Sequence, residues 1–157
     1  MNKKNTFLRG FVYAFRGIRR CIREERNFRF HMVAAVYVCL LAPSFLRSRA
    51  EGALLALTIG LVLCAEAVNT AIERLVNRIS PEQHPLAGAA KDIAAGAVLL
   101  TAVAAVAVAV FLFGRWETWV KLFTHWYHTP IKPLLLILSA IPAVLFIVKS
   151  PSKEMFQ

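Results

Sequence analysis

The chain carries a row of polar side chains directly after an apolar run, where a membrane helix tolerates them least. Glu66, Asn69 and Glu73 follow the apolar residues 54–65, and their spacing places all three on one face of a helix. An ionisable side chain costs roughly 2.5 to 3.5 kcal/mol near the centre of a bilayer, and less toward its surface. Three polar groups on one face, two of them ionisable, therefore indicate a shared ligand. The simpler interpretation is that the helix leaves the lipid here, which explains Arg74 but not Glu66.

The oxygen atoms of this face suit a particular chemistry. Mg²⁺ prefers hard oxygen ligands and binds them together with phosphate oxygens, and Glu25 adds a carboxylate just before the first apolar segment. Lys91 supplies a compact positive charge for phosphates. Phosphoryl transfer requires positioning, charge neutralisation and a group that accepts a proton. The set contains a candidate for each, and it predicts a site for a nucleotide and a metal.

Three sequence motifs carry a family resemblance. They are E-x-x-N-T-A-I-E at 66–73, H-P-x-x-x-x-A-K-D at 84–92 and E-R-N-F-R-F-H at 25–31. Together they resemble the small integral-membrane lipid kinases of bacteria, the diacylglycerol kinase and undecaprenol kinase family. The resemblance implies phosphorylation of the hydroxyl of a membrane lipid, with ATP and Mg²⁺. It also implies a homotrimer with active sites shared between protomers.

The resemblance assigns roles to residues of this chain. Glu66 would be the base acting on the lipid hydroxyl, and Glu25 and Glu73 would be metal ligands. Lys91 and Asp92 would hold the nucleotide.

Three further positions belong to the same assignment. Asn69 would organise the polar groups beside the nucleotide. His84 is a candidate for touching the nucleotide, although a histidine without a ligand is the more common outcome in a loop. Asn77 stands where we expect aspartate in many relatives, which puts any charge-dependent contact there in doubt.

The lipid and the class of activity leave alternatives open. Undecaprenol is slightly favoured over diacylglycerol because R-N-F-R-F-H looks more like the Gram-positive undecaprenol kinases. A membrane protein of another class could use the same carboxylates as an ion relay, without catalysis. Such a relay has no obvious use for Lys91 and Asp92.

Composition indicates a single membrane domain. The chain has 157 residues, of which 58% are hydrophobic, and its mean hydropathy is +0.57. Its formal net charge of +10 could suggest nucleic acid, but 9 of its 19 Lys and Arg residues lie within the first 29 positions, ahead of the apolar segments. No folded soluble domain is available to present them, so we expect no nucleic-acid partner. Anionic lipid headgroups fit this basic lead-in better.

Periodicity predicts an all-α membrane protein. Residues 1–113 form the lipid kinase membrane domain, and 114–157 form an aromatic outer loop and a fourth membrane segment. The expected elements of the first part are an amphipathic surface helix over 6–24 and transmembrane helices over 28–46, 52–76 and 87–113.

The distribution of basic residues predicts the orientation. The segments expected inside hold 9, 3 and 2 Lys and Arg residues, against 2 and 3 in the outer loops. We therefore expect a multi-pass protein of the bacterial inner membrane with a cytoplasmic N-terminus. No glycine-rich phosphate loop occurs in the sequence, so the site must be built from helices. All residues assigned to chemistry precede residue 93. If the tail only anchors or packs, a chain cut after residue 113 should keep its activity within roughly tenfold.

Overall fold

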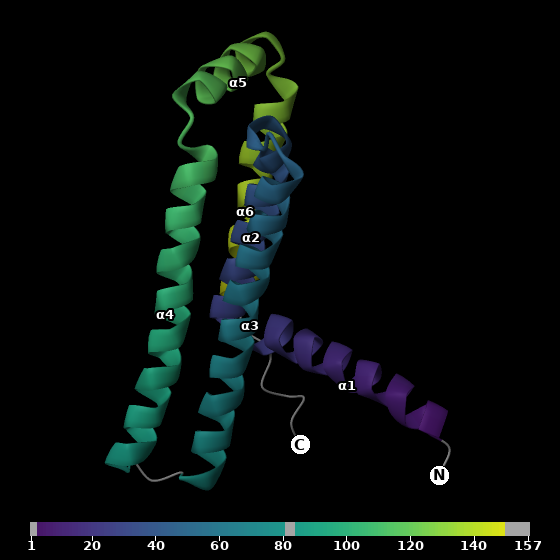
Figure 1. The fold of residues 1–157 in the computed structure, drawn as a ribbon, viewed down its shortest axis with the longest axis vertical. Coiled ribbons are helices and arrows are strands. Elements are labelled where there is room, and N and C mark those ends of the chain that lie inside the picture. Colours follow the sequence, from purple (N-terminus) through teal and green to yellow (C-terminus); the bar gives the residue numbers. More distant parts are fainter. Residues whose placement is uncertain (1–2, 81–83, 150–157) are drawn as a thin grey trace.

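The computed structural model describes residues 3–80 and 84–149, with side chains from residue 7 onward. Within these residues the chain is helical and contains no strand (Figure 1). The helices are α1 (Lys3–Glu24), α2 (Arg26–Phe45), α3 (Arg49–Ile79), α4 (Pro85–Phe113), α5 (Trp116–His128) and α6 (Ile131–Val148).

Four of these helices form a bundle. α3 and α4 pack as an antiparallel hairpin, α2 packs beside α3, and α6 packs against α2 (Figure 1). α2, α3, α4 and α6 are each long and apolar enough to cross a membrane. α5 lies across one end of the bundle, and α1 leaves it obliquely near the other end. This confirms the predicted fold class: an all-α membrane protein with an N-terminal amphipathic helix, three spans and an additional C-terminal membrane segment.

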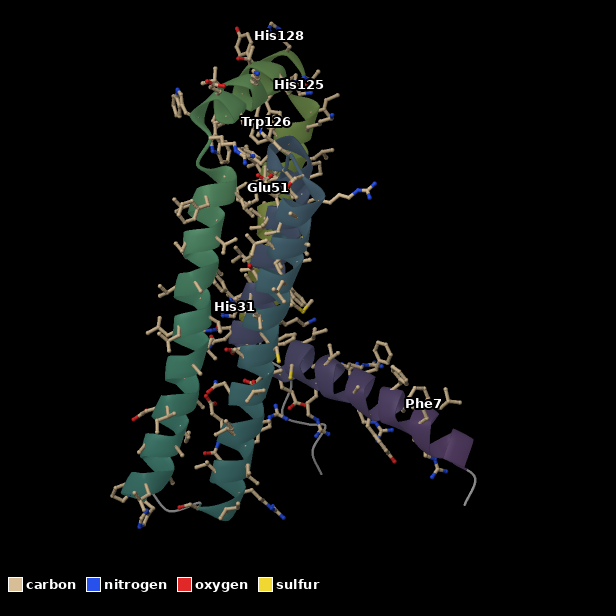
Figure 2. All side chains as sticks on the ribbon, viewed as in Figure 1. Phe7, His31, Glu51, His125, Trp126 and His128 are labelled. Atoms are coloured by element: carbon tan, nitrogen blue, oxygen red, sulfur yellow. The ribbon has the colours of Figure 1, made fainter. Side chains whose placement is uncertain are left out.

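The corner between α1 and α2 consists of one residue. Glu25 has φ −106° and ψ 114°, an extended conformation that interrupts the helix and lets α1 turn away from the bundle. α1 presents Phe7 (labelled in Figure 2), Phe11 and Phe15 at its exposed surface, as expected for a helix lying in a membrane interface. The corner thus fixes Glu25 where the interfacial helix meets the bundle.

Local sequence explains where the two long helices begin. The Ser48 hydroxyl accepts a hydrogen bond from the Glu51 backbone N–H at 3.1 Å, while Oε2 of Glu51 accepts one from the Arg47 N–H at 2.6 Å. This reciprocal pairing resembles a capping box, and it satisfies the Glu51 N–H, one of those that the first helical turn leaves free. At the start of α4, His84 is the capping residue and Pro85 occupies the first turn, where its missing N–H costs nothing.

The lengths of the helices show that part of the bundle extends beyond the thickness of a bilayer. α3 has 31 residues and α4 has 29, or about 46 and 43 Å at 1.5 Å per residue, whereas α2 has 20, or about 30 Å. The α3–α4 hairpin consequently projects past the level at which α1 leaves the bundle (Figure 1). A hydrocarbon core of about 30 Å measured from the start of α3 ends near Asn69. On this measure the polar face lies near one boundary of the membrane.

The tightly packed core lies in the other half of the bundle. Ala42, Leu55 and Leu112 form a buried cluster, and Phe45 beside it is only 1% exposed. On the surface of the bundle, α4 and α6 expose most of their large apolar side chains. Helices that are apolar all round are typical of membrane spans, which face lipid or other protein.

The segment expected to be an aromatic outer loop contains a helix instead. α5 places Trp119 against Phe45, with ring centroids 4.7 Å apart, and its indole N–H donates to the Phe113 carbonyl at 2.7 Å. Arg115 donates to Oε1 of Glu51 and to the Phe45 carbonyl, both at 2.5 Å. Figure 2 shows Trp126 on the same helix, at the end of the bundle remote from α1. These contacts tie the aromatic segment to the ends of α2, α3 and α4.

Candidate active site

The polar face of α3 is largely buried. Glu66 is 3% exposed and Asn69 7% exposed, and Thr70 beside them is also buried, whereas Glu73 is partly exposed. The Asn69 amide nitrogen donates to Oε1 of Glu73 at 2.8 Å. Among the described residues, the buried Oδ1 of Asn69 has no hydrogen-bond partner. A buried acceptor without a partner is costly, so this atom is available for a ligand.

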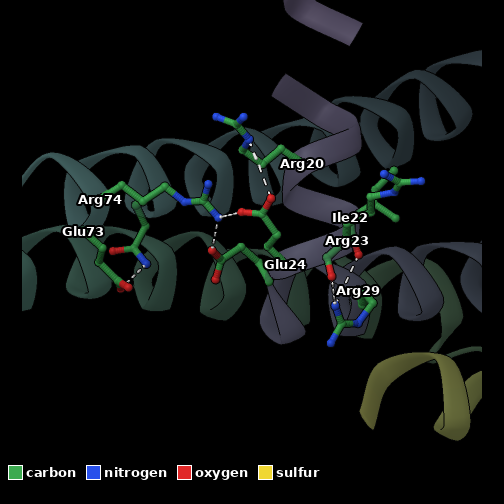
Figure 3. Close-up of polar contacts among 9 residues, drawn as sticks. Arg20, Ile22, Arg23, Glu24, Arg29, Glu73 and Arg74 are labelled. Atoms are coloured by element: carbon green, nitrogen blue, oxygen red, sulfur yellow. Dashed lines mark hydrogen bonds and ion pairs between the residues drawn. The ribbon is translucent and has the colours of Figure 1, made fainter. Parts of the chain in front are cut away.

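A second group of charges surrounds the corner of the chain (Figure 3). Arg74 on α3 donates through Nη2 to Oε2 of Glu24 at 2.5 Å and to Oε1 of Glu25 at 2.8 Å. Arg20, one turn earlier on α1, pairs with Glu24 at 3.6 Å. Arg74 therefore joins the interfacial helix to the helix that carries the polar face.

The two groups form one constellation. The carboxyl group of Glu66 lies within electrostatic range of both Glu73 and Glu25. The structure thus brings together the predicted base, both predicted metal ligands and Asn69, from α3 and the α1–α2 corner. The roles of these residues as base and metal ligands remain predictions.

The donor set is compatible with Mg²⁺. Its oxygens come from Glu66, Asn69, Glu73 and Glu25, and the unpaired Oδ1 of Asn69 has the character of a hard ligand. The ion pair with Arg74 occupies one oxygen of Glu25. Over residues 3–80 and 84–149, no group of three His, Cys, Asp or Glu side chains is arranged to hold a metal alone. Mg²⁺ often shares its coordination with phosphate oxygens and water, which fits an incomplete protein shell.

The remaining predicted residues lie on the projecting hairpin. The Lys91 ammonium group on α4 donates to Oδ1 of Asn77 at 3.1 Å, so the asparagine found in place of an expected aspartate still binds the lysine. Asp92 is exposed. Nδ1 of His84 accepts a weak hydrogen bond from the Leu86 N–H at 3.3 Å, and its imidazole acts as the helix cap. The structure places His84 by this local role and not among the carboxylates.

Sequence reasoning undervalued two members of the corner. Neither Glu24 nor Arg74 was assigned to the site, yet Arg74 forms ion pairs with both Glu24 and Glu25. The sequence did contain a signal: Glu24 and Glu25 are adjacent at a predicted helix end, and Arg74 had no assigned partner. Cys21 lies within electrostatic range of Arg74 and Glu25, and its burial raises the pKa of its thiol.

Comparison with known proteins identifies the family of this chain. A family model described as prokaryotic diacylglycerol kinase matches residues 12–113, which end where α4 ends. Undecaprenol kinase of Bacillus subtilis is 43% identical over 112 residues, covering 71% of this chain and 91% of that protein. Diacylglycerol kinase of Synechocystis is 46% identical over 100 residues, covering 62% and 57%. Diacylglycerol kinase of Escherichia coli K12 is 35% identical over 94 residues, covering 60% and 77%. The chain therefore belongs to the prokaryotic diacylglycerol kinase family and is a membrane lipid kinase.

Proposed function

We propose that this lipid kinase transfers the γ-phosphate of ATP to the hydroxyl of undecaprenol in a Mg²⁺-dependent reaction, with diacylglycerol as the alternative acceptor. The observation that carries the proposal is the polar row of buried Glu66 and Asn69 and partly exposed Glu73, with its unpaired amide oxygen, at the inner boundary of the membrane. At that depth a lipid hydroxyl and a water-soluble nucleotide can reach the same groups.

Glu66 is the proposed base. It accepts the proton of the lipid hydroxyl as the oxygen attacks the γ-phosphorus, and the bond between that phosphorus and the bridging oxygen of ADP breaks. Burial keeps bulk water, a competing acceptor of the phosphoryl group, away from the carboxylate. An ion relay is no longer needed to explain the buried carboxylates, because the family is one of kinases.

Glu25 and Glu73 are the proposed ligands of Mg²⁺, and the free amide oxygen of Asn69 lies next to Glu73. When bound, Mg²⁺ neutralises charge on the phosphates. Lys91 and Asp92 are the proposed nucleotide contacts on α4, and Lys91 is already oriented by Asn77. His84 is the least supported contact, because its ring caps α4.

The substrate assignment is supported by similarity. The relative named undecaprenol kinase aligns over 91% of its own length, whereas the Synechocystis and Escherichia coli relatives named diacylglycerol kinase align over 57% and 77% of theirs. The sequence R-N-F-R-F-H at 26–31 points the same way.

We further propose a homotrimer in the bacterial inner membrane, with the N-terminus and the α3–α4 hairpin in the cytoplasm. The basic residues before α2 and on the hairpin support this orientation. The exposed apolar surface of α4, including Leu99, Val103 and Val106, supports contact between protomers, as do the small residues Gly88 and Gly96 on the same helix. Sites shared between protomers would bring a second chain to the partly exposed side of the constellation.

A direct test is transfer of labelled γ-phosphate from ATP to a panel of lipids in detergent or vesicles. The panel contains undecaprenol, a shorter polyprenol, diacylglycerol and a ceramide, each with and without Mg²⁺. Labelled undecaprenyl phosphate as the main product supports the proposal. Preferential labelling of diacylglycerol selects the alternative, and labelling that is unaffected by chelation of Mg²⁺ contradicts the metal requirement.

A further inference from the structure

A buried arginine at the start of α2 connects two helix ends that are far apart in the sequence. Arg29 is 4% exposed and lies one turn after Glu25, whose backbone carbonyl accepts the Arg29 N–H at 3.2 Å. Its guanidinium group donates through Nε and Nη2 to the Ile147 carbonyl at 3.2 and 3.0 Å. Through Nη1 it donates to the carbonyls of Ile22 and Arg23 at 3.3 and 3.0 Å, as Figure 3 shows.

These acceptors share a chemical character. Ile22 and Arg23 belong to the last turn of α1, and Ile147 to the last turn of α6, so their carbonyls have no partner within their own helices. The last turn of a helix also carries partial negative charge, which favours a cation. Among the described residues, Arg29 forms no ion pair with a carboxylate, so its charge is stabilised by the two helix ends. We call Arg29 and these three carbonyls the Arg29 clasp.

The clasp lies next to the active-site corner. On one side of Glu25, Arg74 holds the carboxylate against α3; on the other, Arg29 holds the last turn of α1 through backbone atoms. Only one residue, Glu25 itself, separates the two helices. A change in the angle between α1 and α2 therefore moves the Glu25 side chain directly.

The third arm of the clasp comes from outside the part of the chain shared with the family model. That model ends at residue 113, and α6 begins at Ile131. α6 is also joined to α2 by the hydrogen bond between the Tyr37 hydroxyl and Ser139 Oγ, at 2.9 Å. We propose that Arg29 is a positioning residue for the kinase reaction. Through the Arg29 clasp, α6 helps to fix the angle between α1 and α2 and therefore the position of Glu25. This gives the C-terminal segment a role in positioning the active site, in addition to anchoring or packing.

The first test measures geometry and needs no activity. Nitroxide labels at positions 19 on α1 and 144 on α6 report the distance between these helices by double electron–electron resonance, in full-length protein with the native cysteines replaced by alanine. Labelled chains are diluted with unlabelled protein so that distances between protomers do not contribute. A pair at positions 78 and 89, on the α3–α4 hairpin, is the reference. Arg29→Gln should broaden the distribution of distances between positions 19 and 144 and leave that of the reference pair unchanged. If the distribution for positions 19 and 144 is the same in the variant as in wild type, the proposed clasp is wrong.

The second test measures catalysis and rests on the proposed function. Arg29→Gln should lower kcat/KM for Mg·ATP by roughly tenfold to a hundredfold, the loss expected from small misplacement of a reacting group, with little change in KM for the lipid. Arg29→Lys, which keeps the charge and can reach one of the two helix ends, should recover part of both the rate and the narrow distribution. Arg49→Gln removes an exposed arginine from the start of α3, outside the motifs and the site, and should match wild type.

The outcomes separate the two proposals. If wild-type protein phosphorylates no lipid, the proposed function fails, and the distance measurement still decides the clasp. If Arg29→Gln broadens the distribution but keeps wild-type kinetics for Mg·ATP, Arg29 only stabilises the fold and the positioning role is wrong. If the glutamine variant does not fold, Arg29→Lys provides the same comparison. Equal loss of activity in Arg49→Gln would also contradict the role, because it would indicate a general effect of charge.

Discussion

Replacing Glu66 by glutamine tests the central chemical assignment. The substitution keeps the size of a side chain that is 3% exposed, so it removes the proton acceptor with little change in packing. General bases contribute about 10²- to 10⁴-fold to rate, or about 2.7 to 5.5 kcal/mol of barrier. Water has little access to this buried position, so it cannot readily replace the carboxylate as the proton acceptor. We therefore expect a loss in the upper part of that range, about 10³-fold or more in kcat.

The assay is phosphoryl transfer to the preferred lipid at saturating Mg·ATP, with size-exclusion profile and nucleotide binding measured on the same preparation. Glu51→Gln is the matched control, because it removes a carboxylate from the same helix about 22 Å away, at the end held by Arg115. The control should keep the wild-type kcat. A Glu66→Gln enzyme whose kcat lies within tenfold of wild type would refute the assignment of this residue as the base.

Three further predictions concern the corner and its neighbours. Glu25→Ala and Glu73→Ala should each raise the Mg²⁺ concentration needed for half-maximal activity, with partial rescue at high Mg²⁺; titration curves that overlay wild type would show that neither is a ligand. Arg74→Gln removes the ion pairs with Glu24 and Glu25 and should lower the free energy of unfolding by only about 1 kcal/mol, because these side chains are partly exposed. The difference in stability between wild type and variant, measured in SDS titrations, should become smaller with added salt. With the other two cysteines replaced by alanine, Cys21 should react with maleimide at least tenfold more slowly than a free thiol at pH 7.5, since burial limits access and raises its pKa; the rate should increase with pH, and equal rates would contradict its burial.

The sequence by itself determined the class of fold and the approximate extent of the spans. Apolar length and helical periodicity are local properties, and a chain in lipid must satisfy its backbone hydrogen bonds within each segment. For the same reason the spacing of Glu66, Asn69 and Glu73 was sufficient to place them on one face of a helix. Motif resemblance, not periodicity, connected this face to lipid phosphorylation.

Tertiary structure decided which groups surround that face. The pairing of Arg74 with Glu24 and Glu25 joins residues about fifty positions apart, and no local pattern specifies it. The helical form of residues 116–128 was missed because an interfacial aromatic belt has the same composition in a loop or a helix.

The clasp shows the limit of sequence reasoning most clearly. Arg29 is bound by main-chain carbonyls, and every residue type has one, so the sequence carries no sign of its partners. Only the packing of α6 against α2 brings the Ile147 carbonyl to the guanidinium group, 118 positions away in the chain. Side-chain chemistry could be inferred from residue types and spacing, whereas contacts made through the backbone depend on how the helix ends meet in space.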